Sequence, residues 1–174
     1  MIRTKNLQLI PCELTHLEAA IRDKKELETI LDVSVPDSWP VFAEAIPYSY
    51  ERLKDDPSLL GWWTYLFIHA GDKALVGLGG FKGKADDAGM VEIGYEIVPE
   101  YRHRGLATEA AQGLVRFAFS QKYIKTVEAH TLAETNPSTR VLEKVGMKYV
   151  GAKHDPDDGE VWHWRLARED YEGA

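Results

Sequence analysis

Residues 99–110, PEYRHRGLATEA, place positive charge directly before a glycine and a predicted helix. Gly105 follows three basic residues, Arg102, His103 and Arg104, and the helix begins with Leu106, Ala107 and Thr108. The first amides of a helix lack intrachain acceptors and lie at the positive end of its dipole. A glycine has no side chain to block a ligand. We therefore predict that this turn binds a pyrophosphate; an ordinary junction with a solvated basic cluster is the alternative.

Two carboxylates follow a strand-like alternation in residues 90–99, MVEIGYEIVP. Glu92 and Glu96 point to the same face, and Gly94 leaves space between them. Burying a carboxylate is unfavourable unless it is paired or used, so either residue could act as a general base. Glu92 could instead pair with an arginine or bind a cationic ligand. His130 is a further candidate base, although a lone strand histidine is more often structural.

The helices and strands that would position these residues can be predicted from the periodicity of apolar residues and from the residues that begin and end each element. Seven runs are typical of strands: residues 7–11, 62–70, 74–83, 90–99, 125–133, 148–152 and 160–167. Helical patterns cover residues 14–31, 50–54 and 106–121. Thr15 and Glu18 fit a capping box at the first of them. Asn136, Pro137 and Gly146 mark both ends of one more short helix. This order predicts a mixed α/β fold.

The composition fits one compact domain over residues 1–174, because 44% of the residues are hydrophobic and 28% are charged. The formal net charge of −7 argues against nucleic-acid binding, which needs a basic face. Cys12 is the one cysteine, so we expect no internal disulfide and a cytoplasmic location. No apolar run reaches the length of a membrane span, so no membrane partner is expected either.

Two motifs together resemble the GNAT N-acetyltransferases. R-H-R-G-L-A is similar to the family signature (Arg/Gln)-x-x-Gly-x-(Gly/Ala), and it follows a strand as it does in that family. NPSTRVLEKVGM is similar to the next family motif, an Asn that opens a helix ending in Lys-x-Gly-Phe, with Met147 in place of Phe. The N-terminal TKNLQLIPCELTHLEAA and the C-terminal VWHWRLARED look like the RimJ/RimL branch, which acetylates ribosomal-protein N-termini and has many relatives that act on small molecules. The resemblance covers nearly the whole chain except residues 33–61.

The resemblance implies a fold, a donor and a site. The fold would be a central, mostly antiparallel, splayed sheet of about seven strands flanked by helices. Acetyl-coenzyme A would be the co-substrate, with its pyrophosphate on the amides of residues 104–108 and no metal involved. Its pantetheine arm would run beside Glu96, Ile97 and Val98, and Asn136 would bind the arm from the other side of the slot. Glu92 matches the most frequent catalytic glutamate of the family, which makes it the predicted base.

The proton donor is where this sequence departs from the family. Many members carry a Tyr six residues after the Asn, but Leu142 stands there and cannot donate a proton. Ser138 is the predicted substitute, with helix capping as its alternative role. Tyr149 is a more remote candidate. A backbone amide near Ile97 could polarise the thioester carbonyl.

The acceptor is expected to be a small-molecule or peptide amine. Residues 33–63 include Trp39, Tyr48, Tyr50, Trp62 and Trp63 amid prolines, and these rings could form its binding wall by cation–π contact or close the core. Glu92, Asp37 or Glu44 could receive its ammonium group. Two other hypotheses stay open: a non-catalytic acyl-coenzyme A-binding module of the same fold, and a different phosphate-ligand enzyme, although the usual nucleotide loops are absent. The sequence leaves the oligomeric state open, with a homodimer as one alternative.

Overall fold

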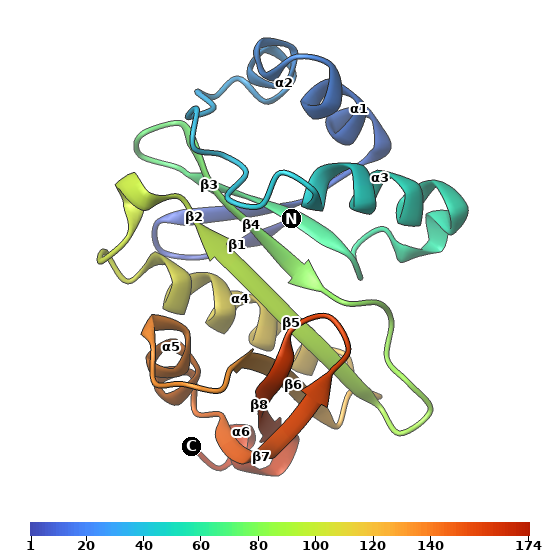
Figure 1. The fold of residues 1–174 in the computed structure, drawn as a ribbon, viewed down its shortest axis with the longest axis vertical. Helices are drawn as coiled ribbons and strands as arrows, with labels where there is room; N and C mark the ends of the chain where they lie inside the picture. Colours follow the sequence, from blue (N-terminus) through green and yellow to red (C-terminus); the bar gives the residue numbers. More distant parts are fainter.

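The computed structural model describes residues 1–174, which form an eight-stranded sheet flanked by helices (Figure 1). The strands are β1 (Ile2–Arg3), β2 (Leu7–Pro11), β3 (Thr64–His69), β4 (Ala74–Phe81), β5 (Met90–Ile97), β6 (Thr126–Leu132), β7 (Lys148–Asp155) and β8 (Gly159–Ala167). The helices are α1 (Leu14–Arg22), α2 (Lys24–Leu31), α3 (Ala45–Asp55), α4 (Leu106–Ser120), α5 (Pro137–Val145) and α6 (Arg168–Glu172), with short 3-10 turns at Pro57–Leu59 and Pro99–Tyr101. The predicted mixed α/β fold is confirmed.

The sheet has the order β1-β2-β3-β4-β5-β6-β8-β7, and every neighbouring pair is antiparallel except β5 with β6. It contains eight strands rather than about seven, because the two-residue β1 pairs with β2 through Ile2 and Leu9. A strand of two residues is too short to show an alternating pattern, so periodicity could not reveal it.

The parallel pair of β5 and β6 separates after three residues. Its register joins Met90 with Thr126, Val91 with Val127 and Glu92 with Glu128, and then ends. On its other edge β5 stays paired with β4 as far as Ile97. The sheet is therefore splayed beyond Glu92, as the family resemblance implies, and a gap opens beside residues 93–97.

The N-terminal helices differ from the sequence prediction at their boundaries. The predicted helix over 14–31 is interrupted at Asp23, whose backbone is extended and whose side chain accepts the N–H of Lys25 to begin α2. The capping box at Thr15 and Glu18 is wrong, since the main-chain N–H of Glu13 donates to His16 Nδ1 at 3.0 Å. The short helix expected at 50–54 is part of the longer α3. These ends depend on tertiary packing, which local patterns do not report.

Helix α4 packs against β1, β2 and β5 through a narrow apolar face. Ala110, Ala111, Leu114 and Ala118 are fully buried on that face. In the first turn, the carboxylate of Glu109 accepts the main-chain N–H and the side-chain amide of Asn6, which fixes the start of α4 to the turn between β1 and β2. None of the helices combines the length and the apolar character that crossing a bilayer requires.

Candidate active site

The first turn of α4 is open to a ligand. Gly105 precedes it in the left-handed conformation, with φ of 75° and ψ of 6°, and no side chain caps the helix. A Cβ atom added at Gly105 would meet no heavy atom within 4 Å, so the space beside this residue is open. His103 is also left-handed, with φ of 61°. The main-chain N–H groups of residues 103–108 make no hydrogen bond within the chain, so they are available to an anion.

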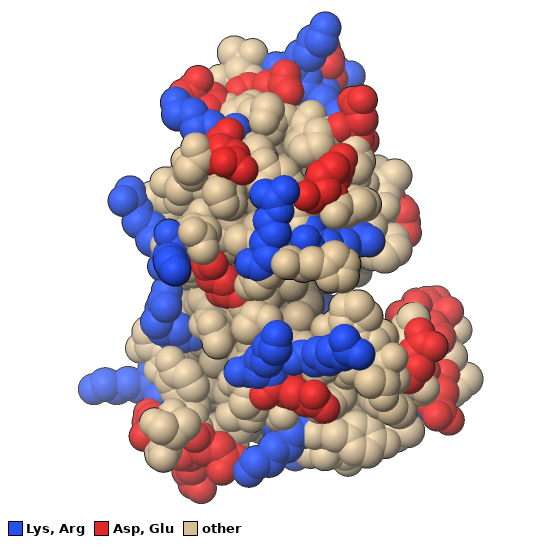
Figure 2. All heavy atoms as spheres, turned by 90° about the vertical axis from the view of Figure 1, so that its left-hand side faces the viewer, with Lys and Arg blue, Asp and Glu red and all other residues tan.

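The basic residues before Gly105 are exposed, and two of them connect this turn to its surroundings. Arg102 Nε donates to the carbonyl of Ile97 at 2.9 Å, which ties the turn to the end of β5. Arg104 donates to the carbonyl of Glu100 at 3.0 Å, and its guanidinium lies 4.6 Å from the ring centroid of Tyr101. Figure 2 shows Lys and Arg side chains gathered over the middle of the side of the molecule that carries this turn, although the net charge of the chain is −7.

The gap beside β5 exposes main-chain donors. The N–H of Val98 donates to Val76 on β4 at 2.9 Å, so by alternation the N–H of Ile97 points to the opposite side, toward the gap. Tyr95 crosses this gap, because its hydroxyl donates to the carbonyl of Ser138 at 3.2 Å. Burial raises the pKa of the Tyr95 hydroxyl, which therefore stays protonated at neutral pH.

Helix α5 begins where the sequence predicts, and both hydrogen bonds of its N-terminal capping box are present. The side chain of Asn136 accepts the N–H of Thr139 at 3.1 Å, and the Thr139 hydroxyl accepts the N–H of Asn136 at 3.1 Å. Ser138 is half-buried, and its hydroxyl makes no hydrogen bond within the chain, so capping does not occupy it. Leu142 is fully buried in the core. Tyr149 lies on the edge strand β7 and is 51% exposed.

A cleft of about 740 Å³ lies between α3, the strands β3, β4 and β5, and the turn between β7 and β8. Its lining includes the aromatic residues Phe42, Tyr48 and Trp63. Its charged lining residues are Arg52, Lys82, Glu96 and Asp157. Volume and lining are those of a site for a small ligand with a few polar contacts.

Glu96 is the acid on the floor of this cleft. Its carboxylate accepts the main-chain N–H of Val41 at 3.0 Å. Burial raises the pKa of Glu96 to about 7, against the opposing effect of this N–H group. A carboxyl group with a pKa near neutrality can both accept and release a proton under physiological conditions.

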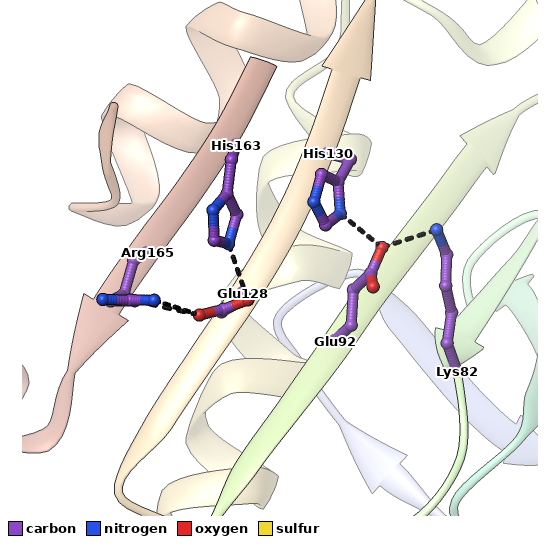
Figure 3. A network of polar contacts seen from close by, with 6 residues as sticks. All are labelled: Lys82, Glu92, Glu128, His130, His163 and Arg165. Atoms are coloured by element: carbon purple, nitrogen blue, oxygen red, sulfur yellow. Dashed lines mark hydrogen bonds and ion pairs between the residues drawn. The ribbon is translucent and has the colours of Figure 1, made fainter. Parts of the chain in front are cut away.

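Glu92 lies on the same face of β5 but outside the lining of the cleft. Its carboxylate pairs with Lys82 Nζ at 2.5 Å and with His130 Nδ1 at 2.8 Å (Figure 3). Burial alone would raise the pKa of Glu92, but the hydrogen bonds and charges of Lys82 and His130 outweigh it, so this pKa lies below its ordinary value. Glu92 is therefore a stable carboxylate in an ion pair and a weak base.

The ion pair of Glu92 is one end of a longer polar network between β5, β6 and β8 (Figure 3). The ring of His130 stacks on that of His163, with centroids 4.7 Å apart and planes 8° from parallel. His163 Nε2 lies 2.6 Å from the buried carboxylate of Glu128, which also accepts from Arg165 at 2.8 Å. The network gives His130 a partner on each side, which agrees with a structural role, the alternative to its acting as a base.

The structure separates the aromatic residues that the sequence singled out. Tyr48 and Trp63 line the cleft, with ring centroids 5.9 Å apart. Trp39 is buried and donates to the carbonyl of Gly77, Trp62 packs on Phe81 and Phe117, and Tyr50 donates to Glu18. Asp37 and Glu44 do not line the cleft.

Sequence reasoning missed Arg52, Lys82 and Asp157 as cleft residues. A signal for Lys82 was present, because pairing the predicted strands 74–83 and 90–99 as a hairpin places Lys82 beside Glu92, whose carbonyl accepts its N–H at 2.9 Å. Arg52 and Asp157 had no such signal, since they reach the cleft from α3 and from the β7–β8 turn. No group of three or more His, Cys, Asp or Glu side chains is arranged to hold a metal ion.

Comparisons with known proteins agree on one family. Residues 6–148 match the family model described as acetyltransferase (GNAT) domain. An uncharacterized N-acetyltransferase of Bacillus subtilis, YjdG, is 30% identical over 148 residues, which are 84% of this chain and 88% of that protein. A GNAT-family acetyltransferase from Bacillus anthracis superposes with a TM-score of 0.68 at 23% identity, over 97% of this chain and 98% of its own. RimL, a ribosomal-protein α-N-acetyltransferase solved with coenzyme A, superposes with a TM-score of 0.68 at 15% identity, over 94% of this chain and 95% of its own.

Proposed function

Because the chain belongs to the GNAT acetyltransferase family, in its RimJ/RimL-like branch, we propose that it moves an acetyl group from acetyl-coenzyme A to a primary amine by direct attack in a ternary complex. One observation carries the proposal. The open turn before α4 is bonded to the end of β5 through Arg102 and Ile97, and the cleft is lined by residues 94–96 of the same strand. A donor site and an acceptor site would therefore meet along β5.

The open turn fits the diphosphate of the donor. The amides of residues 104–108 and the side chains of Arg102, His103 and Arg104 would hold the diphosphate, and the empty space at Gly105 leaves room for it. The rest of the donor would lie in the gap beside Glu96, Ile97 and Val98, with Asn136 opposite. RimL was solved with coenzyme A, which supports the same donor here. When bound, acetyl-coenzyme A supplies a thioester whose acetyl carbon is open to attack.

Glu96 is the base in this proposal. It takes one proton from the ammonium group of the acceptor, and the neutral amine nitrogen then forms a bond to the acetyl carbon while the carbon–sulfur bond breaks. The sulfur leaves with the electron pair and takes a proton from the Ser138 hydroxyl, which in turn receives the second proton of the amine nitrogen, and the proton on Glu96 passes to solvent. The raised pKa of Glu96 and its place on the cleft floor support this assignment.

Ser138 is the proposed proton donor to the leaving sulfur, because its hydroxyl has no partner within the chain and lies at the start of α5. The N–H of Ile97, which points into the gap, is the proposed donor to the thioester carbonyl oxygen. Glu92, which matches the usual catalytic position of the family, holds β5 to Lys82 and His130 in this proposal. We thus assign the base to Glu96, because it lines the cleft and has a raised pKa, whereas Glu92 lies outside the lining.

Thiol release from acetyl-coenzyme A in the presence of a broad panel of amines tests the proposal, with mass spectrometry of the products. We expect acetylated amine and free thiol in equal amounts. Binding of coenzyme A by calorimetry without turnover of any amine would favour the non-catalytic acyl-coenzyme A-binding module. Binding of ATP or NAD in preference to coenzyme A would favour the other phosphate-ligand enzyme.

Three further statements rest on the sequence. We propose that residues 1–174 act as one N-acetyltransferase domain, and a single buried cluster that extends from Ile2 to Leu166 supports this. A cytoplasmic location and a homodimer are also proposals. Cell fractionation and light scattering of the purified chain test them.

A further inference from the structure

Arg52 presents a guanidinium group without an acidic partner at the proposed acceptor cleft. It lies in the last turn of α3, its side chain lines the cleft, and it is exposed. The guanidinium carbon is 5.6 Å from the ring centroid of Trp63. No Asp or Glu oxygen lies within ion-pair distance of it, although its charge helps to lower the pKa of the exposed Asp56, whereas Lys82, the other cation of the cleft, is neutralised by Glu92 at 2.5 Å. The cleft therefore contains one positive charge that the chain itself leaves unpaired.

The remaining charges of the cleft are negative and come from other elements. Glu96 lies on the floor, and Asp157 belongs to the turn between β7 and β8. In Figure 1, β4 and β5 run between α3 and the β7–β8 hairpin, so Arg52 and Asp157 approach the cleft from different sides. A ligand that satisfies this pattern is positive where it faces Glu96 and Asp157 and negative where it reaches Arg52.

The aromatic wall supports an anion at this place in two ways. The ring of Trp63 stacks beneath the guanidinium, which orders the Arg52 side chain before a ligand arrives. The indole N–H of Trp63 is buried and has no hydrogen-bond partner. A ligand oxygen or a water molecule is the partner that this donor lacks, because buried polar groups are otherwise nearly always paired.

Resting on the proposed acetyl transfer, we propose that the acceptor is a small amine that also carries an anionic group, and that Arg52 binds this group while Glu96 receives the amine. The planar guanidinium matches a carboxylate or a phosphate with two parallel hydrogen bonds. A polyamine fits poorly, because its second ammonium group would face the unpaired charge of Arg52. The volume of about 740 Å³ suits a small molecule.

The test compares matched amines that differ only in the anionic group. Each of several amino acids is assayed beside the amine that results from its decarboxylation, together with phosphoethanolamine and spermidine. We expect kcat/KM to be about tenfold higher or more for the anionic member of the best pair. A preference for the amino acid identifies a carboxylate, and a preference for phosphoethanolamine identifies a phosphate. Either result supports the inference.

Variants of Arg52 test whether this residue causes the preference for the anionic amine. Arg52→Ala should remove the advantage of the anionic amine, Arg52→Lys should keep part of it, and Arg52→Glu should favour spermidine. Arg3→Glu makes the same charge change outside the cleft and should leave the preference unchanged. Circular dichroism melting confirms that each variant folds, and calorimetry with coenzyme A checks the donor site.

Two results would overturn the inference while acetyl transfer stands. One is a wild-type preference for the decarboxylated amines or for spermidine. The other is an unchanged preference in a folded Arg52→Glu variant. Failure of every amine, with donor binding intact, would instead contradict the proposed function and this inference together.

Discussion

Glu92 and Glu96 lie on the same face of β5, four residues apart, but their carboxylates have opposite surroundings. Glu92 is paired with Lys82 at 2.5 Å and with His130 at 2.8 Å, whereas Glu96 accepts a main-chain N–H from Val41 and pairs with no cation. Burial therefore raises the pKa of Glu96 to about 7, while the two partners of Glu92 overcome burial and lower its pKa. One strand thus presents a structural carboxylate and a candidate base.

The first prediction concerns the pH dependence of turnover. If Glu96 is the base, kcat/KM rises with pH up to about 7 and then levels, because the carboxyl group must be ionised to accept a proton. Glu96→Gln should lower kcat by about a hundredfold and remove this rise. Glu92→Gln is the matched control and should keep it. Loss of the rise in Glu92→Gln but not in Glu96→Gln would return the base to the position that the family resemblance implies.

The second prediction is that Glu96→Gln stabilises the fold at alkaline pH. The pKa of Glu96 is raised from 4.5 to about 7, so between these values the folded chain binds more protons than the unfolded chain and stability falls as pH rises. A glutamine can still accept the N–H of Val41 without an ionisation cost. The free energy of unfolding at pH 8 should increase by up to about 3 kcal/mol, and much less at pH 4.

Glu92→Gln should do the reverse, which makes it the control for this measurement. The lowered pKa of Glu92 contributes stability above the ordinary pKa of a glutamate, and this stability is lost as pH falls through the folded value. Urea unfolding should show a loss of about 1 to 2 kcal/mol at pH 7, shrinking below about pH 4. Equal changes in the free energy of unfolding in the two variants, both at pH 7 to 8 and near pH 4, would refute the difference in surroundings.

The third prediction addresses the open turn before α4. Gly105→Val puts a branched side chain in front of the amides of the first turn and should weaken coenzyme A binding at least about a hundredfold, measured by calorimetry. The left-handed backbone adds roughly 1 to 2 kcal/mol of strain. Gly159→Val carries the same strain, because φ is +74° there and +75° at Gly105, and neither Cβ meets an atom within 4 Å. Gly159→Val should keep donor affinity, and equal affinity in both variants would place the diphosphate elsewhere.

Elements with explicit local signals could be predicted from the sequence. Asn136, Pro137 and Gly146 define α5 at both ends, because capping and left-handed termination act within a few residues. The alternation around Glu92 and Glu96 gives their common face. By contrast, α3 starts five residues before its predicted position, Ala45 instead of Tyr50, since it packs chiefly on α1, a long-range contact that local patterns do not report.

The difference between the two glutamates could not be predicted in full. Aligning the two predicted strands as a hairpin identifies the partner of Glu92, because this alignment places Lys82 beside it. The surroundings of Glu96 depend on Val41, which is 55 positions away in a segment without regular periodicity. Burial and long-range contacts set a pKa, so residue type and spacing gave the face but not the proton affinity.

The last prediction separates two roles at the start of α5. Ser138→Ala should lower kcat roughly tenfold or more, since the hydroxyl has no partner within the chain and is the proposed donor to the leaving sulfur. Its free energy of unfolding should change by less than about 0.5 kcal/mol. Asn136→Ala removes the acceptor of the Thr139 N–H and should cost about 1 kcal/mol of stability. Ser138→Thr keeps a hydroxyl and should restore part of the rate. A loss of stability without a loss of kcat in Ser138→Ala would show a structural role, and a greater loss of kcat in Tyr95→Phe would move the acid to the hydroxyl that crosses the gap.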